Sequence, residues 1–187
     1  MSELEHVEHG FGPVWDAHSR VLLLGSMPSP KSRSAGFYYM HPRNRFWHVL
    51  QALYVQYPDS SPESERANEA LNLTTGSIES RAVFLLQHHI ALWDVLESCD
   101  INGASDATIR NPEPTNLVPL LTQSSISYIF TTGKKAAALF SKYSQPNLES
   151  SGLHVSMRAL PSTSSANASM HLPELIEAYR IIRKYSL

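Results

Sequence analysis

The stretch VLLLG at residues 21–25 is a short apolar run that ends at a glycine and is followed by serine and proline residues. Continuous apolar runs of this length are typical of buried parallel strands, and the Gly-Ser step predicts a loop at the carboxyl end. Similar segments follow at residues 90–95, 126–131 and 153–160, and helical patterns occupy residues 42–54, 116–123, 134–143 and 172–185. This alternation predicts an α/β fold of three layers, α/β/α, in which helices cover both faces of a central four-stranded parallel sheet.

The remaining segments are less regular. We expect a polar connector at residues 58–65, a weak helix at 67–73, an apolar segment of undecided type at 81–89 and a long surface loop at 97–114. The last of these contains glycine and two prolines among polar residues. The sequence shows no internal repeat and no linker long enough to divide it, so residues 1–187 are expected to form a single domain.

The composition excludes several classes of protein. With 42% hydrophobic residues among 187, the chain has enough apolar surface to form a core, and no apolar run approaches the length of a membrane span. Cys99 is the only cysteine, which excludes a disulfide framework and a thiolate metal site. The nine histidines include no helical i,i+4 pair of the zincin type. Because the first residues are acidic and polar, unlike a secretory signal, we expect a cytoplasmic protein. We also expect a monomer without metal or cofactor.

Charge is unevenly distributed along the chain. Residues 17–58 contain five basic residues and no acidic one, whereas the rest contains ten basic against seventeen acidic residues. The five are Arg20, Lys31, Arg33, Arg43 and Arg45. A basic segment on an acidic body favours a polyanion at one face, although a solvated loop without a partner is equally compatible with it.

Two loops follow strands at the expected carboxyl edge of the sheet, where such folds bind ligands. The first, GSMPSPKSRSAGFYYMHPRNRFW at residues 25–47, interleaves aromatic and basic residues, as stacking on bases and binding of phosphates require. The same aromatics are also compatible with simple packing at the sheet end, and Phe46 and Trp47 have the helical spacing of core residues. The second, LPSTSSANA at residues 160–168, offers hydroxyls for phosphate binding or, more simply, for helix capping. Asp94, at the end of the second strand, is compatible with a pocket or with anchoring its own loop.

The first loop resembles the uracil-DNA glycosylase superfamily, and most of all its hypoxanthine (deoxyinosine) and mismatch-specific branches. The mismatch-specific enzymes have G-x-N-P-G, then a stacking aromatic, then H-P-x-N-R-F-W. Here residues 25–29 read GSMPS, Tyr39 follows, and residues 41–47 read HPRNRFW. The resemblance extends from about Arg20 to the last helix and implies excision of a flipped, deaminated base from DNA, hypoxanthine being favoured.

Two departures shape what the resemblance implies. Met27 occupies the position where relatives have a catalytic Asn or Asp, and Leu160 stands where uracil-specific relatives often have His. Both changes are similar to the deoxyinosine branch, in which the Asn of H-P-x-N is catalytic, here Asn44, whose amide would hold the attacking water. The residues expected to bind the base are Gly25, Ser26, Met27, Pro28, Tyr39 and Ser162. Those expected to contact DNA are Lys31, Arg33, Arg43, Ser164 and Ala166, the last replacing a bulky wedge.

Three alternatives stay open on the sequence. A mismatch-specific uracil or thymine glycosylase would catalyse the same reaction on another base. A nucleic-acid-binding module that has lost catalysis would bind DNA in a salt-dependent way without releasing a base. A nucleoside hydrolase would act on free inosine and would have no use for a basic loop.

Overall fold

The central element is a sheet of four parallel strands. The computed structural model describes residues 4–54 and 72–187. The strands are β2 (Val21–Gly25), β3 (Ile90–Asp94), β6 (Tyr128–Thr132) and β7 (Ser156–Leu160), in the order β3-β2-β6-β7. All three pairings are parallel. The apolar run at residues 21–25 therefore lies in an interior position and is buried at every residue, which confirms the predicted four-stranded parallel sheet.

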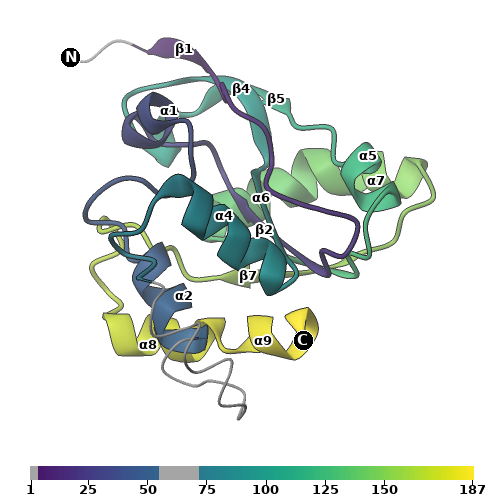
Figure 1. The fold of residues 1–187 in the computed structure, drawn as a ribbon. Coiled ribbons are helices and arrows are strands. Elements are labelled where there is room, and N and C mark those ends of the chain that lie inside the picture. Colours follow the sequence, from purple (N-terminus) through teal and green to yellow (C-terminus); the bar gives the residue numbers. More distant parts are fainter. Residues whose placement is uncertain (1–3, 55–71) are drawn as a thin grey trace.

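Alternate residues of β2 face two separate cores. Val21 and Leu23 belong to one cluster, and Leu22 and Leu24 belong to the other. The first cluster includes buried residues of α2 (Phe46–Tyr54), α4 (Ile78–Gln87), α8 (Leu172–Tyr179) and α9 (Ile181–Ser186). The second includes residues of α5 (Val118–Thr122), α6 (Lys134–Leu139) and α7 (Gln145–Ser150). Because successive side chains of a strand point to opposite faces, the two clusters define helical layers on both sides of the sheet (Figure 1).

A second, antiparallel sheet was not predicted. It contains β1 (Glu5–Glu8), β4 (Leu96–Ile101) and β5 (Arg110–Pro114), in the order β1-β4-β5. The prediction of a surface loop at residues 97–114 is therefore wrong. In β4 the buried residues Leu96, Cys99 and Ile101 are separated by polar ones, so the strand lacks a continuous apolar run. The prolines of β5 are tolerated because β5 is an edge strand. A short 3-10 helix, η1 (Asp106–Thr108), lies in the connection between β4 and β5.

Several element boundaries also differ from the sequence prediction. The loop at residues 26–41 contains a short helix, α1 (Pro30–Ala35), with Ser29 as its N-cap. The helix expected from Pro42 begins at Phe46 instead, because the Asn44 side chain accepts from the Phe46 amide and residues 42–43 form a turn. The helix expected at 134–143 continues through a π-helical turn, η2 (Phe140–Ser144), into α7, and the last helix is divided into α8 and α9.

The segment of undecided type at residues 81–89 lies mostly within α4. The predicted connector at 58–65 and all but the end of the weak helix at 67–73 lie outside the described residues. Across residues 4–54 and 72–187, every helix is too short or too polar to cross a membrane.

Candidate functional site

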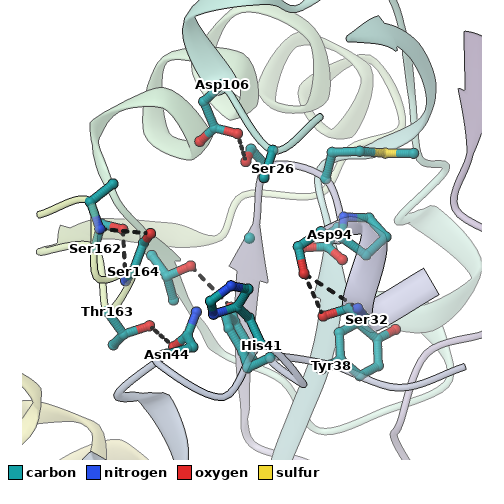
Figure 2. Close-up of a pocket in the computed structure, with 18 of the residues that line it drawn as sticks. Ser26, Ser32, Tyr38, His41, Asn44, Asp94, Asp106, Ser162, Thr163 and Ser164 are labelled. Atoms are coloured by element: carbon teal, nitrogen blue, oxygen red, sulfur yellow. Dashed lines mark hydrogen bonds between the residues drawn. The ribbon is translucent and has the colours of Figure 1, made fainter. Parts of the chain in front are cut away.

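A pocket of about 290 Å³ opens at the carboxyl end of the central sheet. Its walls come from the loop after β2, the loop after β7 and the connection between β4 and β5 (Figure 2). The predicted site residues that line it are Gly25, Ser26, Met27, Pro28, Tyr39, Asn44, Ser162, Ser164 and Ala166. The fold thus brings the residues expected to bind the base and the residue expected to be catalytic to one cavity, whereas Lys31, Arg33 and Arg43 lie outside its lining. Their functional roles stay predictions.

Asn44 is held in one orientation by two donors. Its Oδ1 accepts from the Phe46 backbone N–H at 3.0 Å and from the Thr163 hydroxyl at 2.9 Å. A backbone N–H can only donate, so the amide oxygen must occupy this position and Nδ2 must face the other way. Figure 2 shows that nitrogen turned away from Thr163, within the pocket that Asn44 lines. Asn44 therefore presents N–H donors to the cavity.

Arg45 ties the two loops together. Its guanidinium donates to the carbonyl oxygens of Ser164 at 2.6 Å, Asn167 at 3.0 Å and Met170, and its Nε donates to that of Thr163 at 3.3 Å. The Arg45 backbone N–H donates to the same Thr163 carbonyl at 3.0 Å. These contacts fix the late loop against the HPRNRFW segment and so set the position of the Thr163 hydroxyl next to Asn44.

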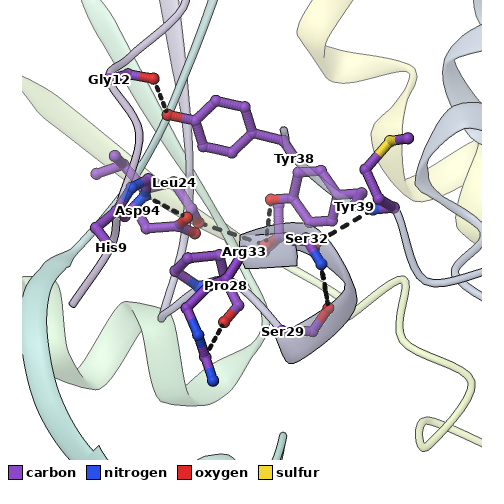
Figure 3. Close-up of polar contacts among 12 residues, drawn as sticks. His9, Gly12, Leu24, Pro28, Ser29, Ser32, Arg33, Tyr38, Tyr39 and Asp94 are labelled. Atoms are coloured by element: carbon purple, nitrogen blue, oxygen red, sulfur yellow. Dashed lines mark hydrogen bonds and ion pairs between the residues drawn. The ribbon is translucent and has the colours of Figure 1, made fainter. Parts of the chain in front are cut away.

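Three of the five cations in the basic segment are engaged within the protein. Besides Arg45, Arg20 donates to the carbonyl of Leu187, and Arg33 donates to that of Pro28 at 2.8 Å (Figure 3). Lys31 and Arg43 are exposed. The arginines of the basic segment thus serve mainly to hold the protein's own loops and terminus, and Lys31 and Arg43 are its solvent-facing cations.

Tyr39 has a constrained backbone and a fixed ring. Its φ of 55° lies in the left-handed region, which is uncommon for an aromatic residue and occurs where the surroundings enforce it. The ring stacks on Phe46 with centroids 3.8 Å apart, and its hydroxyl is 3.0 Å from Oγ1 of Thr132. Burial, followed by the charge of Asp94, raises the pKa of the Tyr39 phenol well above its ordinary value, so the ring stays neutral. Phe46 and Trp47 are buried, which confirms that they belong to the core.

Asp94 and His9 form a buried pair beneath Gly25. His9 Nε2 lies 2.9 Å from Oδ2 of Asp94, and the side chains are only 1% and 5% exposed (Figure 3). A Cβ at residue 25 would lie 2.2 Å from the other carboxylate oxygen of Asp94. Asp94 lines the pocket, as the sequence allowed, but its partner His9 was not predicted. The contact with His9 thus holds Asp94 in position next to Gly25 in the pocket lining.

Asp106 is the pocket carboxylate that the sequence analysis missed. The Ser26 hydroxyl donates to its Oδ1 at 2.8 Å, and burial raises the pKa of Asp106. Asp106 lies in η1, inside the segment expected to be a surface loop. The signal that was overlooked is the Asn-Gly pair at residues 102–103, which is typical of a chain reversal between strands.

The last features of the site are the contacts of His41 and the arrangement of possible metal ligands. His41 lines the pocket, and its Nδ1 accepts from the Arg43 backbone N–H at 3.2 Å. No group of three or more His, Cys, Asp or Glu side chains in the described part of the chain is arranged to hold a metal ion.

The chain is similar to known proteins over most of its length. A "Hypoxanthine DNA glycosylase" from Methanosarcina barkeri is 29% identical over 106 residues, which are 57% of this chain but only 58% of that relative. A protein of the same description from Methanosarcina acetivorans is 27% identical over 162 residues, covering 86% of this chain and 89% of the relative. A solution NMR structure of a candidate uracil DNA glycosylase from Methanosarcina acetivorans has a TM-score of 0.69 and 25% identity, covering 95% of this chain and 99% of that one. Residues 12–181 match the family described as the uracil DNA glycosylase superfamily. The chain therefore belongs to the uracil DNA glycosylase superfamily.

Proposed function

We propose that this protein is a DNA glycosylase that hydrolyses the N-glycosidic bond of a deaminated base, with hypoxanthine as the favoured base. Family membership supports glycosylase chemistry, and the two relatives described as hypoxanthine DNA glycosylases favour that base. The observation on which the proposal depends is the Asn44 amide, whose N–H groups face a pocket at the sheet edge.

The donor at Asn44 suits a deaminated base for a simple chemical reason. Deamination replaces an exocyclic amino group, a donor, with a carbonyl oxygen, an acceptor. An N–H group aimed at that oxygen therefore binds hypoxanthine, uracil or xanthine and opposes the amino group of adenine or cytosine. Sites that hydrogen-bond a substrate group reject analogues without it by large factors, about 10⁴ or more in favourable cases.

The pocket also offers an aromatic surface to a flipped base. A base within a duplex is out of reach, so the nucleotide must rotate out of the stack at a cost of a few kcal/mol. The Tyr39 ring, fixed between Phe46 and Thr132, is the aromatic surface on which we propose that the base stacks. Gly25, Ser26, Met27, Pro28 and Ser162 would then surround its edges.

The mechanism separates charge across the breaking bond. Positive charge develops on the sugar as the bond to the base breaks, and negative charge develops on the base. Donors fixed in advance around that base, which we propose to be the Asn44 amide and backbone N–H groups of Ser26 and Met27, stabilise the anion, an effect commonly worth several kcal/mol. Because its oxygen is already occupied, Asn44 acts in this scheme by donating and not by accepting a proton from water.

The DNA backbone would contact the rim of the pocket. Lys31 and Arg43 are exposed and close in sequence to pocket residues, and Arg33, Ser164 and Ala166 complete the surface that we propose for the strand. Phosphate contacts of this kind set the position of the DNA without reading its sequence. The small side chain of Ala166 would leave the duplex largely unpenetrated.

The experiment is a cleavage assay on labelled duplexes that contain one deoxyinosine, uracil, xanthine or normal adenine. Wild type and Asn44→Ala are compared, and alkali then cuts any abasic site. We expect release of hypoxanthine by the wild type, none from adenine, and a reaction of the variant that is slower by about 10²–10³-fold. Preferential release of uracil or thymine would contradict the assignment of hypoxanthine. Salt-sensitive binding without any abasic site, or hydrolysis of free inosine alone, would contradict a DNA glycosylase.

A further inference from the structure

Hydrolysis at this site removes a proton from the attacking water, and a protein group that accepts this proton speeds the reaction. This expectation rests on the glycosylase function proposed above. The Asn44 amide faces the pocket with its donors and an amide is not basic at neutral pH, and Met27 has no proton-accepting group. The acceptor must therefore come from another residue that lines the same cavity.

Five titratable side chains line the pocket. The phenols of Tyr38 and Tyr39 stay protonated because burial raises their pKa values. Of the remaining three, Asp94 and His41 are engaged by other groups. Oδ2 of Asp94 is paired with His9, and the Asp94 side chain is only 5% exposed. Nδ1 of His41 accepts from the Arg43 amide, so the neutral ring carries its proton on Nε2 and offers the pocket a donor. Asp106 is the third.

Asp106 has the geometry of an available base. Its carboxylate is partly exposed, lines the pocket and receives one hydrogen bond, at 2.8 Å, from the hydroxyl of Ser26. Ser26 directly precedes Met27, so the carboxylate contacts the residue next to the position at which Met27 stands. In Figure 2, Asp106 and Ser26 lie on one side of the pocket, and Asn44 and Thr163 lie on another. A nucleotide bound between them would thus have a proton acceptor, Asp106, on one side and an N–H donor, Asn44, on the other.

We propose that Asp106 is the general base of the reaction and that it replaces, from the connection between β4 and β5, the proton acceptor that Met27 cannot provide. A water molecule gives one proton to the Asp106 carboxylate as its oxygen forms the bond to C1′ of the sugar. The bond from C1′ to the base breaks, and its electron pair leaves with the base as an anion. The proton returns from Asp106, through solvent, to the released base.

The electrostatic surroundings of Asp106 are compatible with this role. Burial raises its pKa, which makes the carboxylate a stronger base than an exposed one. The hydrogen bond from Ser26 lowers the pKa, the charge of Asp94 raises it and that of Lys135 lowers it. The charge of Asp106 in turn contributes to the raised pKa values of Cys99 and Tyr39.

The test is a single-turnover pH–rate profile on a hypoxanthine duplex with Asp106→Asn, Ser26→Ala and Asp100→Asn. We expect Asp106→Asn to react more slowly by about 10²–10⁴-fold and to lose the fall in rate at acidic pH. Ser26→Ala should move that fall to higher pH, because the hydrogen bond that it removes lowers the pKa of Asp106. Asp100, on β4 and bonded to Asn111 and His6 away from the pocket lining, is the matched control and should leave the profile unchanged.

The outcomes separate this inference from the function on which it rests. A wild type that releases no base from any duplex overturns both. A wild type that is active and sensitive to Asn44→Ala, with Asp106→Asn within about threefold of it at every pH, overturns the inference alone. The inference is also overturned if Asp106→Asn is slower only because its melting temperature is lower and if Ser26→Ala leaves the fall in rate at acidic pH at the same pH. A slower Asp106→Asn with an unchanged or higher melting temperature supports it.

Discussion

The Thr163 hydroxyl donates to Oδ1 of Asn44 over 2.9 Å, and this contact connects the two loops at the residue proposed to be catalytic. Thr163 is itself 1% exposed and accepts from Arg45 through its carbonyl. The orientation of the Asn44 amide therefore depends on a loop more than a hundred residues away in the sequence.

Thr163→Val tests this dependence. The substitution keeps the shape but removes the donor, so the amide of Asn44 loses one of its two anchors and rotates more freely. We expect about a tenfold slower release of hypoxanthine and a loss of about 1 kcal/mol in the free energy of unfolding. Thr163→Ser should restore the rate. Full activity of Thr163→Val would show that the hydroxyl does not position the amide.

Arg45→Lys tests the connection between the loops. A lysine keeps the charge but cannot donate to several carbonyls in the divergent directions that the guanidinium reaches. We expect the free energy of unfolding in urea to fall by about 2–3 kcal/mol. The matched control is Arg43→Lys at an exposed neighbouring position, which should stay within about 0.5 kcal/mol of the wild type. Equal effects of the two variants would contradict a structural role for Arg45.

Lys31→Ala and Arg43→Ala test the proposed DNA surface. Each variant removes an exposed cation, so the slope of log binding constant against log salt should become less negative by about 0.9 for each phosphate that the protein no longer neutralises. Arg20→Ala serves as the control, because Arg20 precedes β2 at the opposite edge of the sheet and donates to the Leu187 carbonyl. A salt dependence altered by Arg20→Ala and by neither of the others would place the DNA elsewhere.

Gly25→Ala tests the pocket floor. The new Cβ would lie 2.2 Å from Oδ1 of Asp94 and 3.4 Å from the Tyr39 hydroxyl, and Asp94 is already held by His9. We expect a loss of about 1–3 kcal/mol in stability, together with slower base release as Asp94 is displaced. Gly12→Ala, where a Cβ meets nothing within 4 Å, is the comparison and should cost little. If both variants unfold at the temperature of the wild type and release the base at its rate, the close approach of Gly25 to Asp94 does not matter for the pocket.

Asp106→Asn should change how stability depends on pH. Because burial raises the pKa of Asp106 in the folded state, that state binds the proton more tightly than the unfolded chain does. The contribution of this group to stability is present below its unfolded pKa of about 3.9 and is lost as the pH rises through the folded value. The variant should therefore gain stability relative to the wild type between acidic and neutral pH. The free energy of unfolding of both proteins is measured in urea at pH 4 and at pH 7. A difference between the two proteins that is the same at both pH values would contradict a raised pKa for Asp106.

The central sheet was predictable because its strands are continuous apolar runs that end at turn residues, and the HPRNRFW segment located Asn44 at the sheet edge. The second sheet was not predictable by the same signal. Its strands β4 and β5 are as long as those of the central sheet, but β4 mixes polar and buried residues and β5 has no buried residue. The register of β4 also depends on pairing with β1, about ninety residues away. Asp106 was missed for the same reason, since only the pairing of distant segments brings an isolated carboxylate of a polar stretch to Ser26.

The buried His9–Asp94 pair has a practical consequence for anyone who prepares this protein. The stretch shared with the family begins at residue 12, so a clone trimmed to that stretch would lack His9 and strand β1. Asp94 would then face the interior without its partner, and β4 would lose one of its two neighbours and present an open edge. Such a shortened protein would be prone to aggregate and to lose activity while every pocket-lining residue was still encoded. Preparations for assay should retain the residues before position 12.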